Sequence, residues 1–182
     1  MNALPTAVFL DRDGTINVDT SYVGRPEDLR LIDGAAEAIA RVNSMLIPVV
    51  VVTNQSGIAR GYFTEEDSER VARRLDEMLA AKGAHIDATY ICPHGPDAGC
   101  HCRKPGLLLY HKAATENPEI VLEKSLFIGD RKRDVQPAVA LGGNGVLVPS
   151  PSTPADEVEW AEKYARVAPT LATALDWYLC TN

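Results

Sequence analysis

Two aspartates, Asp11 and Asp13, lie one residue apart directly after an apolar run at residues 7–10. A glycine and a hydroxyl follow at Gly14 and Thr15. Two carboxylates at this spacing can together bind one divalent cation. They can also have separate catalytic roles, one as a nucleophile and the other as a general acid and base. Because Asp and Gly are also ordinary turn residues, the stretch alone is equally compatible with an acidic turn.

Polar side chains also follow two later apolar runs. Residues 49–52 are four valines that precede Thr53, Asn54, Gln55 and Ser56, and residues 125–128 precede Gly129, Asp130 and, four residues on, Asp134. Short continuous apolar runs are typical of strands that are buried on both faces of a parallel sheet. The carboxyl ends of such strands open at one edge, so we expect these groups to converge with Asp11 and Asp13.

The converging residues have the composition of a phosphoryl-transfer site. Two or three aspartates supply the hard oxygen ligands that Mg²⁺ prefers. Hydroxyls, amides and cations suit a phosphoryl group, because its transfer is catalysed mainly by positioning and by neutralising its oxygens. The donors and cations in question are Thr53, Asn54, Ser56, Arg103, Lys104 and Arg131.

A second cluster of metal-binding residue types lies between positions 92 and 102. Cys92, His94, Cys100 and Cys102 form the pattern C-x-H-x5-C-x-C. Side chains two residues apart in an extended segment point to the same side, so the pair Cys92 and His94 and the pair Cys100 and Cys102 can each bind the same ion. Three thiolates and one imidazole make a closed structural Zn²⁺ site, with His101 as an alternative ligand at poorer spacing. We infer that zinc fixes this loop so that Arg103 and Lys104, which follow it directly, point at the substrate.

Apolar runs and helical patterns alternate along the chain, which predicts a three-layer, Rossmann-like parallel sheet with helices on both faces. The expected strands are residues 7–10, 49–52, 88–92, 125–128 and 145–148. The expected helices are residues 34–45, 64–83, 107–116 and 135–141, with helical pieces over 156–180 around 165–168. Thr64 is the expected N-cap of the second helix, and Pro137 is expected in the first turn of the fourth.

Length and composition limit the classes of protein. A chain of 182 residues with 46% hydrophobic and 24% charged residues suits one globular domain, residues 1–182. No apolar run is long enough to span a membrane, and no secretory signal precedes residue 7, so we expect a cytoplasmic protein. The formal net charge of −7 argues against nucleic-acid binding. Clustered cysteines in such a protein more often bind metal than form disulfides, and Cys180 is expected to be an unliganded thiol.

Four ordered motifs resemble those of the haloacid dehalogenase superfamily of phosphatases. They are residues 11–15 (Asp-Arg-Asp-Gly-Thr), the strand-ending Thr53, Lys104, and Gly129-Asp130 with Asp134. The four together are much more specific than any one motif. The resemblance implies the haloacid dehalogenase-like fold, capless because the intervals between motifs have no room for an inserted domain.

The same resemblance implies a role for each motif residue. Asp11 would be the nucleophile that forms an aspartyl-phosphate, and Asp13 the general acid and base. Thr53 and Lys104 would bind the phosphoryl group. Mg²⁺ would be held by Asp11, the Asp13 backbone carbonyl and Asp130, with Asp134 acting through water.

The zinc-loop pattern narrows the resemblance to two sister groups, the D-glycero-D-manno-heptose 1,7-bisphosphate phosphatases and the histidinol-phosphate phosphatases. Residues 11–23, 32–34 and 50–61 resemble the heptose enzymes, which implies hydrolysis at the 7-position. The five-residue spacer between His94 and Cys100 resembles the histidinol-phosphate enzymes, so histidinol phosphate is the alternative substrate. By the match to the heptose enzymes, the substrate contacts would be Asp19, Thr20, Ser21, Tyr22, Thr53, Asn54, Gln55, Ser56, Arg103, Lys104 and Arg131.

Two other classes of function fit the sequence less well. A nucleic-acid 3′-phosphatase would need a basic groove, which the acidic chain lacks. A non-catalytic binding module could dispense with Asp11 or Asp13, yet both are present. We therefore expect a monomeric enzyme with a small phosphorylated substrate and no nucleic-acid or membrane partner, whose product would enter lipopolysaccharide biosynthesis. Lys132 and Arg133 are interpreted as solvated residues at a helix start.

Overall fold

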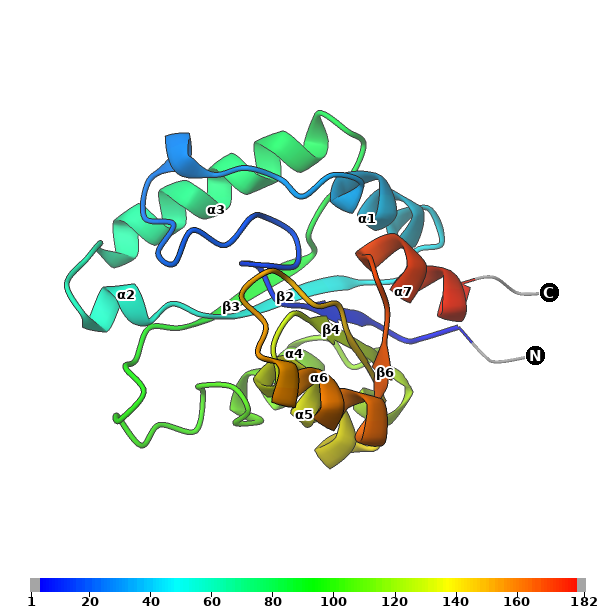
Figure 1. The fold of residues 1–182 in the computed structure, drawn as a ribbon. Coiled ribbons are helices and arrows are strands. Elements are labelled where there is room, and N and C mark those ends of the chain that lie inside the picture. The colour runs from blue at the N-terminus through cyan, green and yellow to red at the C-terminus, as the bar shows by residue number, and fades with distance from the viewer. Residues whose placement is uncertain (1–3, 180–182) are drawn as a thin grey trace.

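The computed structural model describes residues 4–179, and Cys180 lies outside them. A six-stranded, fully parallel sheet has the strand order β3-β2-β1-β4-β5-β6 (Figure 1). The strands are β1 (Val8–Leu10), β2 (Val49–Asn54), β3 (Ala88–Cys92), β4 (Leu126–Gly129), β5 (Asn144–Leu147) and β6 (Arg166–Val167). The five predicted strands are thus confirmed, and β6 is an additional short strand that pairs with β5.

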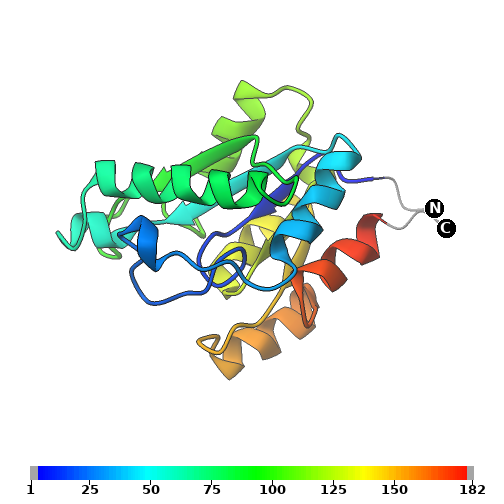
Figure 2. The same cartoon turned by 90° about the horizontal axis from the view of Figure 1, so that it is seen from above.

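Helices cover both faces of this sheet, which confirms the predicted three-layer architecture. One layer contains α1 (Ala35–Ser44), α3 (Glu65–Ala80) and α7 (Leu171–Leu179), and the other contains α4 (Leu108–Glu116), α5 (Lys132–Leu141) and α6 (Ala155–Tyr164) (Figures 1 and 2). The remaining helical segments are short: α2 (Ser56–Ala59) and two 3-10 turns, Pro26–Asp28 and Leu122–Lys124. No inserted domain separates the strands within residues 4–179.

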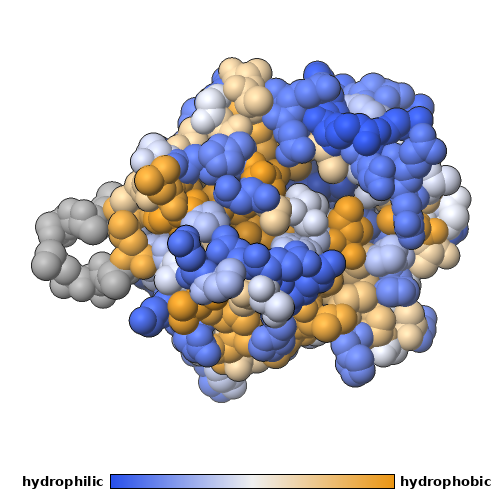
Figure 3. Space-filling model, turned by 180° about the vertical axis from the view of Figure 1, so that it is seen from behind, coloured by the Kyte–Doolittle hydropathy of each residue, from blue (hydrophilic) through white to orange (hydrophobic). Residues whose placement is uncertain are grey.

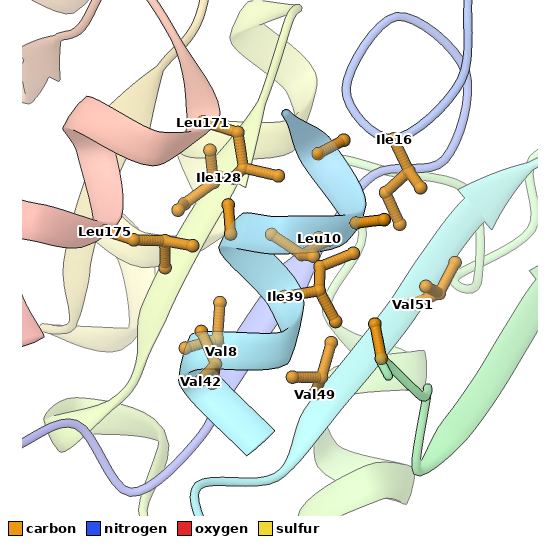
Figure 4. Close-up of a cluster of buried hydrophobic side chains, with 14 of the residues drawn as sticks. Val8, Leu10, Ile16, Ile39, Val42, Val49, Val51, Ile128, Leu171 and Leu175 are labelled. Carbon is orange, nitrogen blue, oxygen red and sulfur yellow. The ribbon is translucent and has the colours of Figure 1, made fainter. Parts of the chain in front are cut away.

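The core explains why the strands are continuously apolar. Alternate residues of β1 and β2 point to opposite sides, and each side meets a helical layer. Toward α1 and α7 the packed side chains include Val8, Leu10, Ile39, Val42, Val49, Val51, Leu171 and Leu175 (Figure 4). Toward α4 and α5 they include Phe9, Val50, Val52, Leu109, Tyr110, Phe127 and Ala138. Every residue of β1 is therefore buried, which fixes the position of the two aspartates after it.

Of the two specific helix predictions, the N-cap of α3 is confirmed and the start of α5 is wrong. Thr64 does cap α3, its hydroxyl accepting a hydrogen bond from the Asp67 amide at 3.1 Å. The helix α5, however, begins at Lys132 and not at residue 135, so Pro137 lies in its interior. The early start follows from Asp134, whose side chain accepts the backbone N–H of Arg131 at 3.0 Å and so satisfies a free donor at the helix N-terminus.

Hydrophobic and hydrophilic residues are interspersed over the back face of the molecule (Figure 3). Large exposed apolar side chains, such as Leu46, Leu108 and Val139, come from separate elements. Among residues 4–179, no helix combines the length and the apolar character needed to cross a bilayer.

Candidate active site

A cavity of about 230 Å³ lies at the carboxyl ends of β1 and β2. Nine of the predicted substrate-contacting residues line it: Asp19, Ser21, Tyr22, Thr53, Asn54, Gln55, Ser56, Arg103 and Lys104. Asp11 and Asp13 line the same cavity. The strand ends that are far apart in the sequence therefore meet at one place, because every strand of the sheet runs in the same direction.

Lys104 is the central cation of this cavity. Its Nζ lies 2.7 Å from Asp11 Oδ1, 2.7 Å from Asp134 Oδ1 and 2.6 Å from the carbonyl oxygen of Val52. The side chain is almost completely buried. Burial opposes the charge, but Asp11 and Asp134 outweigh it and raise the pKa of Lys104, so the ammonium stays charged.

Three carboxylates, Asp11, Asp130 and Asp134, place oxygens within 4.8 Å of one another. Burial, aided by the neighbouring carboxylates, raises the pKa of Asp11 to about 7, although Lys104 opposes the shift. Burial and Asp134 also raise the pKa of Asp130 to about 6. Carboxylates crowded in this way favour a bound divalent cation, which would offset their mutual repulsion.

The free oxygen of Asp130 fits such a cation. Oδ2 accepts a hydrogen bond from the Ser150 hydroxyl at 2.7 Å, whereas the buried Oδ1 has no hydrogen-bond partner within residues 4–179. The Asp130 carboxylate packs directly over Gly14, where an added Cβ would lie 2.4 Å from Oδ2. Gly14 also has a φ of +85°, so both the backbone and the carboxylate above it require glycine.

Asp134 is held in place by two partners. Its Oδ1 pairs with Lys104 and its Oδ2 accepts the amide of Arg131. Because both of its carboxylate oxygens have partners, Asp134 is suited to supporting a metal indirectly, as the sequence motif implies. Asp11 and Asp130 are the carboxylates left to contact the metal directly.

Asp13 is oriented by a set of donors. Arg12 binds it at 2.9 Å, Asn17 Nδ2 donates to its Oδ1 at 2.9 Å, and Gln55 Nε2 donates to its Oδ2 at 2.9 Å. Burial raises the pKa of Asp13, but the Arg12 charge and these hydrogen bonds outweigh burial and hold the pKa below its usual value. The side chain is not part of the three-carboxylate cluster. Asp13 is therefore available for proton transfer in the cavity.

The four residues of the cysteine-rich loop converge as their spacing predicts. Cys92 Sγ lies 3.7 Å from Cys100 Sγ and 3.2 Å from Cys102 Sγ, and His94 Nδ1 lies 3.2 Å from Cys102 Sγ. Ligands on a tetrahedral zinc with Zn–S bonds of 2.3 Å are about 3.8 Å apart, so the cluster has the size of a metal site. His101 is not one of the clustered residues.

Hydrogen bonds connect this loop to the cavity. Asn54 and Lys104 form a reciprocal pair, the Lys104 amide donating to Asn54 Oδ1 at 3.0 Å and Asn54 Nδ2 donating to the Lys104 carbonyl at 3.3 Å. Arg103 Nη1 donates to the His94 carbonyl at 3.2 Å. These hydrogen bonds hold the Lys104 backbone against the end of β2 and the Arg103 side chain against His94.

The structure places some residues differently from the sequence interpretation. Thr20 and Arg131 are absent from the cavity lining, and Arg133, interpreted as solvated, lines it and is only partly exposed. The sequence interpretation assigned no role to Arg12 or Asn17, which orient Asp13. Asn17 lies in a stretch without helical or strand periodicity. Its burial depends on contacts that form only in the folded loop, so the sequence pattern does not indicate it.

Comparison with known proteins defines the class first. A family model described as HAD-hydrolase-like matches residues 101–174, which include Lys104, Asp130 and Asp134. The fold is shared with a crystal structure of D,D-heptose 1,7-bisphosphate phosphatase from B. bronchiseptica complexed with magnesium and phosphate. That structure has a TM-score of 0.87 and 33% sequence identity, and the match covers 96% of this chain and 98% of that one.

Curated relatives narrow the class from the superfamily to one group of phosphatases. The D-glycero-β-D-manno-heptose-1,7-bisphosphate 7-phosphatase of Photorhabdus laumondii is 45% identical over 152 residues, covering 78% of this chain and 79% of the relative. The enzyme of the same name from Escherichia coli K12 is 43% identical, covering 83% and 84%. The chain belongs to this family of haloacid dehalogenase-like phosphatases and is a phosphoric monoester hydrolase.

Proposed function

We propose that this phosphatase removes the 7-phosphate of D-glycero-D-manno-heptose 1,7-bisphosphate in a Mg²⁺-dependent reaction. The observation that carries the proposal is the position of Asp11, which faces the cavity beside a charged Lys104 and within reach of Asp130. This arrangement supplies a nucleophile and the cation that neutralises a phosphoryl group. The names of the relatives support the heptose substrate.

The first half of the reaction transfers the phosphoryl group to Asp11. A carboxylate oxygen of Asp11 attacks phosphorus, while Lys104 and the Thr53 hydroxyl bind the non-bridging oxygens. When bound to Asp11 and Asp130, Mg²⁺ would supply further charge neutralisation at those oxygens. The ester oxygen of the sugar leaves with a proton from Asp13.

Asp13 performs the proton transfers in both halves. The arriving phosphate dianion places negative charge beside Asp13 and raises its pKa, so that the carboxyl can carry the proton that the sugar oxygen needs. Once the sugar has left as an alcohol, the carboxylate is regenerated. The donors Arg12, Asn17 and Gln55 keep it ionised and oriented, and it then removes a proton from the water that hydrolyses the aspartyl-phosphate.

The cavity is suited to a substrate with more than one anionic group. It contains four cations, Arg60, Arg103, Lys104 and Arg133, against the three carboxylates Asp11, Asp13 and Asp19. The chain as a whole has a net charge of −7, so this concentration of cations is local. One phosphate would react at Asp11 while the other is bound by cations nearer the opening.

We further propose that Cys92, His94, Cys100 and Cys102 bind a structural Zn²⁺. We also propose that residues 1–182 form a single phosphatase domain that acts as a cytoplasmic monomer. In this proposal the substrate is a small phosphorylated sugar, and the product is used for lipopolysaccharide biosynthesis.

Replacing Cys100 with serine is expected to remove the zinc and weaken substrate binding. The loop that carries Arg103 would lose one of its four anchors, so KM should rise about tenfold, as is typical when the outer shell of a site is disturbed. Metal content by mass spectrometry and steady-state kinetics check this. Ser44→Ala, an exposed change outside the loop, is the control. Unchanged kinetics in a zinc-free Cys100→Ser protein would show that the loop does not position the substrate.

The proposed substrate is tested by a direct comparison. Phosphate release would be measured with both anomers of the heptose 1,7-bisphosphate and with histidinol phosphate, in the presence and absence of Mg²⁺. We expect kcat/KM for one heptose anomer to exceed that for histidinol phosphate by at least about a hundredfold, because a site built for a second anionic group loses that contact with a monophosphate. A higher kcat/KM for histidinol phosphate would reject the heptose assignment.

A further inference from the structure

Two arginines at the start of α5, Arg131 and Arg133, differ sharply in their surroundings. Arg131 follows Asp130, a proposed Mg²⁺ ligand, in the sequence, and it was the expected substrate contact. Its guanidinium, however, forms a bidentate ion pair with Glu157 of α6, with Nε to Oε2 at 3.0 Å and Nη2 to Oε1 at 2.8 Å. The same carboxylate accepts the amide of Lys132 at 2.7 Å. Arg131 therefore connects α5 to α6 and does not line the cavity.

Arg133 has the opposite character. Its side chain lines the cavity with Asp11, Asp13 and Lys104, and it forms no ion pair with any residue in the range 4–179. Its Nε is buried and has no hydrogen-bond partner among those residues. A guanidinium donor that is removed from water without an acceptor is costly, so its position indicates that an acceptor arrives from outside the chain.

The nearby carboxylates are already engaged. The Arg133 charge opposes the burial that raises the pKa of Asp130, and it adds to the effect of Arg131 that lowers the pKa of Glu157. Neither carboxylate accepts a hydrogen bond from Arg133. Glu157 is held by Arg131, and Asp130 by Ser150 and the carboxylate cluster. The guanidinium is thus near the reacting centre and free to bind an incoming anion.

We propose that Arg133, and not Arg131, is the α5 cation that binds the substrate, and that it contacts the phosphate that is not cleaved. This inference rests on the proposed bisphosphate substrate. The phosphate that reacts would lie against Lys104, whose side chain is almost completely buried beside Asp11. Arg133 is more exposed and lies on the α5 side of the same cavity, whereas Arg60 follows α2 and Arg103 follows the cysteine-rich loop. The geometry makes Arg133 a residue that determines specificity for a second anionic group.

Kinetics with two substrates tests this assignment. Arg133→Ala should raise KM for the heptose 1,7-bisphosphate by about tenfold to a hundredfold, the range for a lost charge-assisted hydrogen bond, and leave kcat within about threefold. The KM for the heptose 7-phosphate, which lacks the second group, should change by less than about threefold. Arg133→Lys, which keeps the charge but not the bidentate geometry, should recover part of the loss.

Arg131→Ala is the matched control, because it removes the same side chain two residues away. It should change KM for the bisphosphate by less than about threefold, while lowering Tm because Glu157 loses its partner; Arg133→Ala should leave Tm unchanged. Equal KM effects for the two variants, or an equal effect of Arg133→Ala on both substrates, would overturn the role of Arg133 but leave the proposed function unaffected. Failure of the wild-type protein to hydrolyse the bisphosphate would contradict the proposed function and the inference with it.

Discussion

Asp11→Asn is expected to abolish Mg²⁺-dependent phosphate release, with kcat falling by about four orders of magnitude or more. That is the scale seen when a nucleophile is removed from a site that otherwise remains intact. Asparagine has nearly the shape of aspartate, so the cavity should keep its form. Its amide cannot form an aspartyl-phosphate, however, and it removes one of the oxygens that face the metal position.

The measurement is steady-state phosphate release with saturating substrate and Mg²⁺. Asp28→Asn, at the end of an exposed 3-10 turn, is the matched control, since the one ion pair that Asp28 forms within residues 4–179 is a surface contact with Arg25. This control should retain wild-type activity. If Asp11→Asn keeps more than about a tenth of wild-type kcat, covalent catalysis by Asp11 is wrong.

Lys104→Met is expected to impair both activity and stability. The methionine leaves Asp11 and Asp134 facing each other in a buried site, together with an unpaired carbonyl at Val52. Removing one partner of a buried charge cluster costs about 3 kcal/mol or more in the free energy of unfolding. The phosphoryl group also loses its most deeply placed cation, so we expect kcat/KM to fall by about three orders of magnitude.

Chemical denaturation and kinetics check the Lys104 prediction. Lys112→Met, which breaks an exposed pair with Glu116 at 3.8 Å, should change stability by less than about 0.5 kcal/mol. Adding Asp134→Asn to Lys104→Met should recover part of the lost stability, because one of the opposing carboxylates is then neutral. A Lys104→Met protein as stable as the wild type would mean that the buried ammonium does not hold these carboxylates together.

The sequence was sufficient for the sheet and for the convergence of the candidate site. Continuous valine and leucine runs can be buried only if both faces of the sheet are covered, and that condition implies parallel strands. Parallel strands place their carboxyl ends together, so Asp11, Thr53 and Asp130 had to lie near one another wherever the helices packed. The cysteine loop was predictable for a similar reason, because extended pairs at i and i+2 orient their ligands alike.

Features that depend on distant partners were not predictable. Whether Arg131 or Arg133 faces the cavity is decided by Glu157, more than twenty residues away on α6. The early start of α5 depends on the Asp134 cap, and β6 is too short for any periodicity to reveal it. Arg12 and Asn17 could be recognised as partners of Asp13 only after the loop had folded around it.

In the proposed reaction, Asp11 takes one particular phosphate, the 7-phosphate, from a heptose bisphosphate. The reaction followed by ³¹P NMR tests it most directly, because the two phosphate esters and inorganic phosphate give separate resonances. We expect the 7-phosphate resonance to convert into inorganic phosphate in the presence of Mg²⁺ while the 1-phosphate resonance persists. Loss of the 1-phosphate, or no conversion of either ester, would contradict the claim.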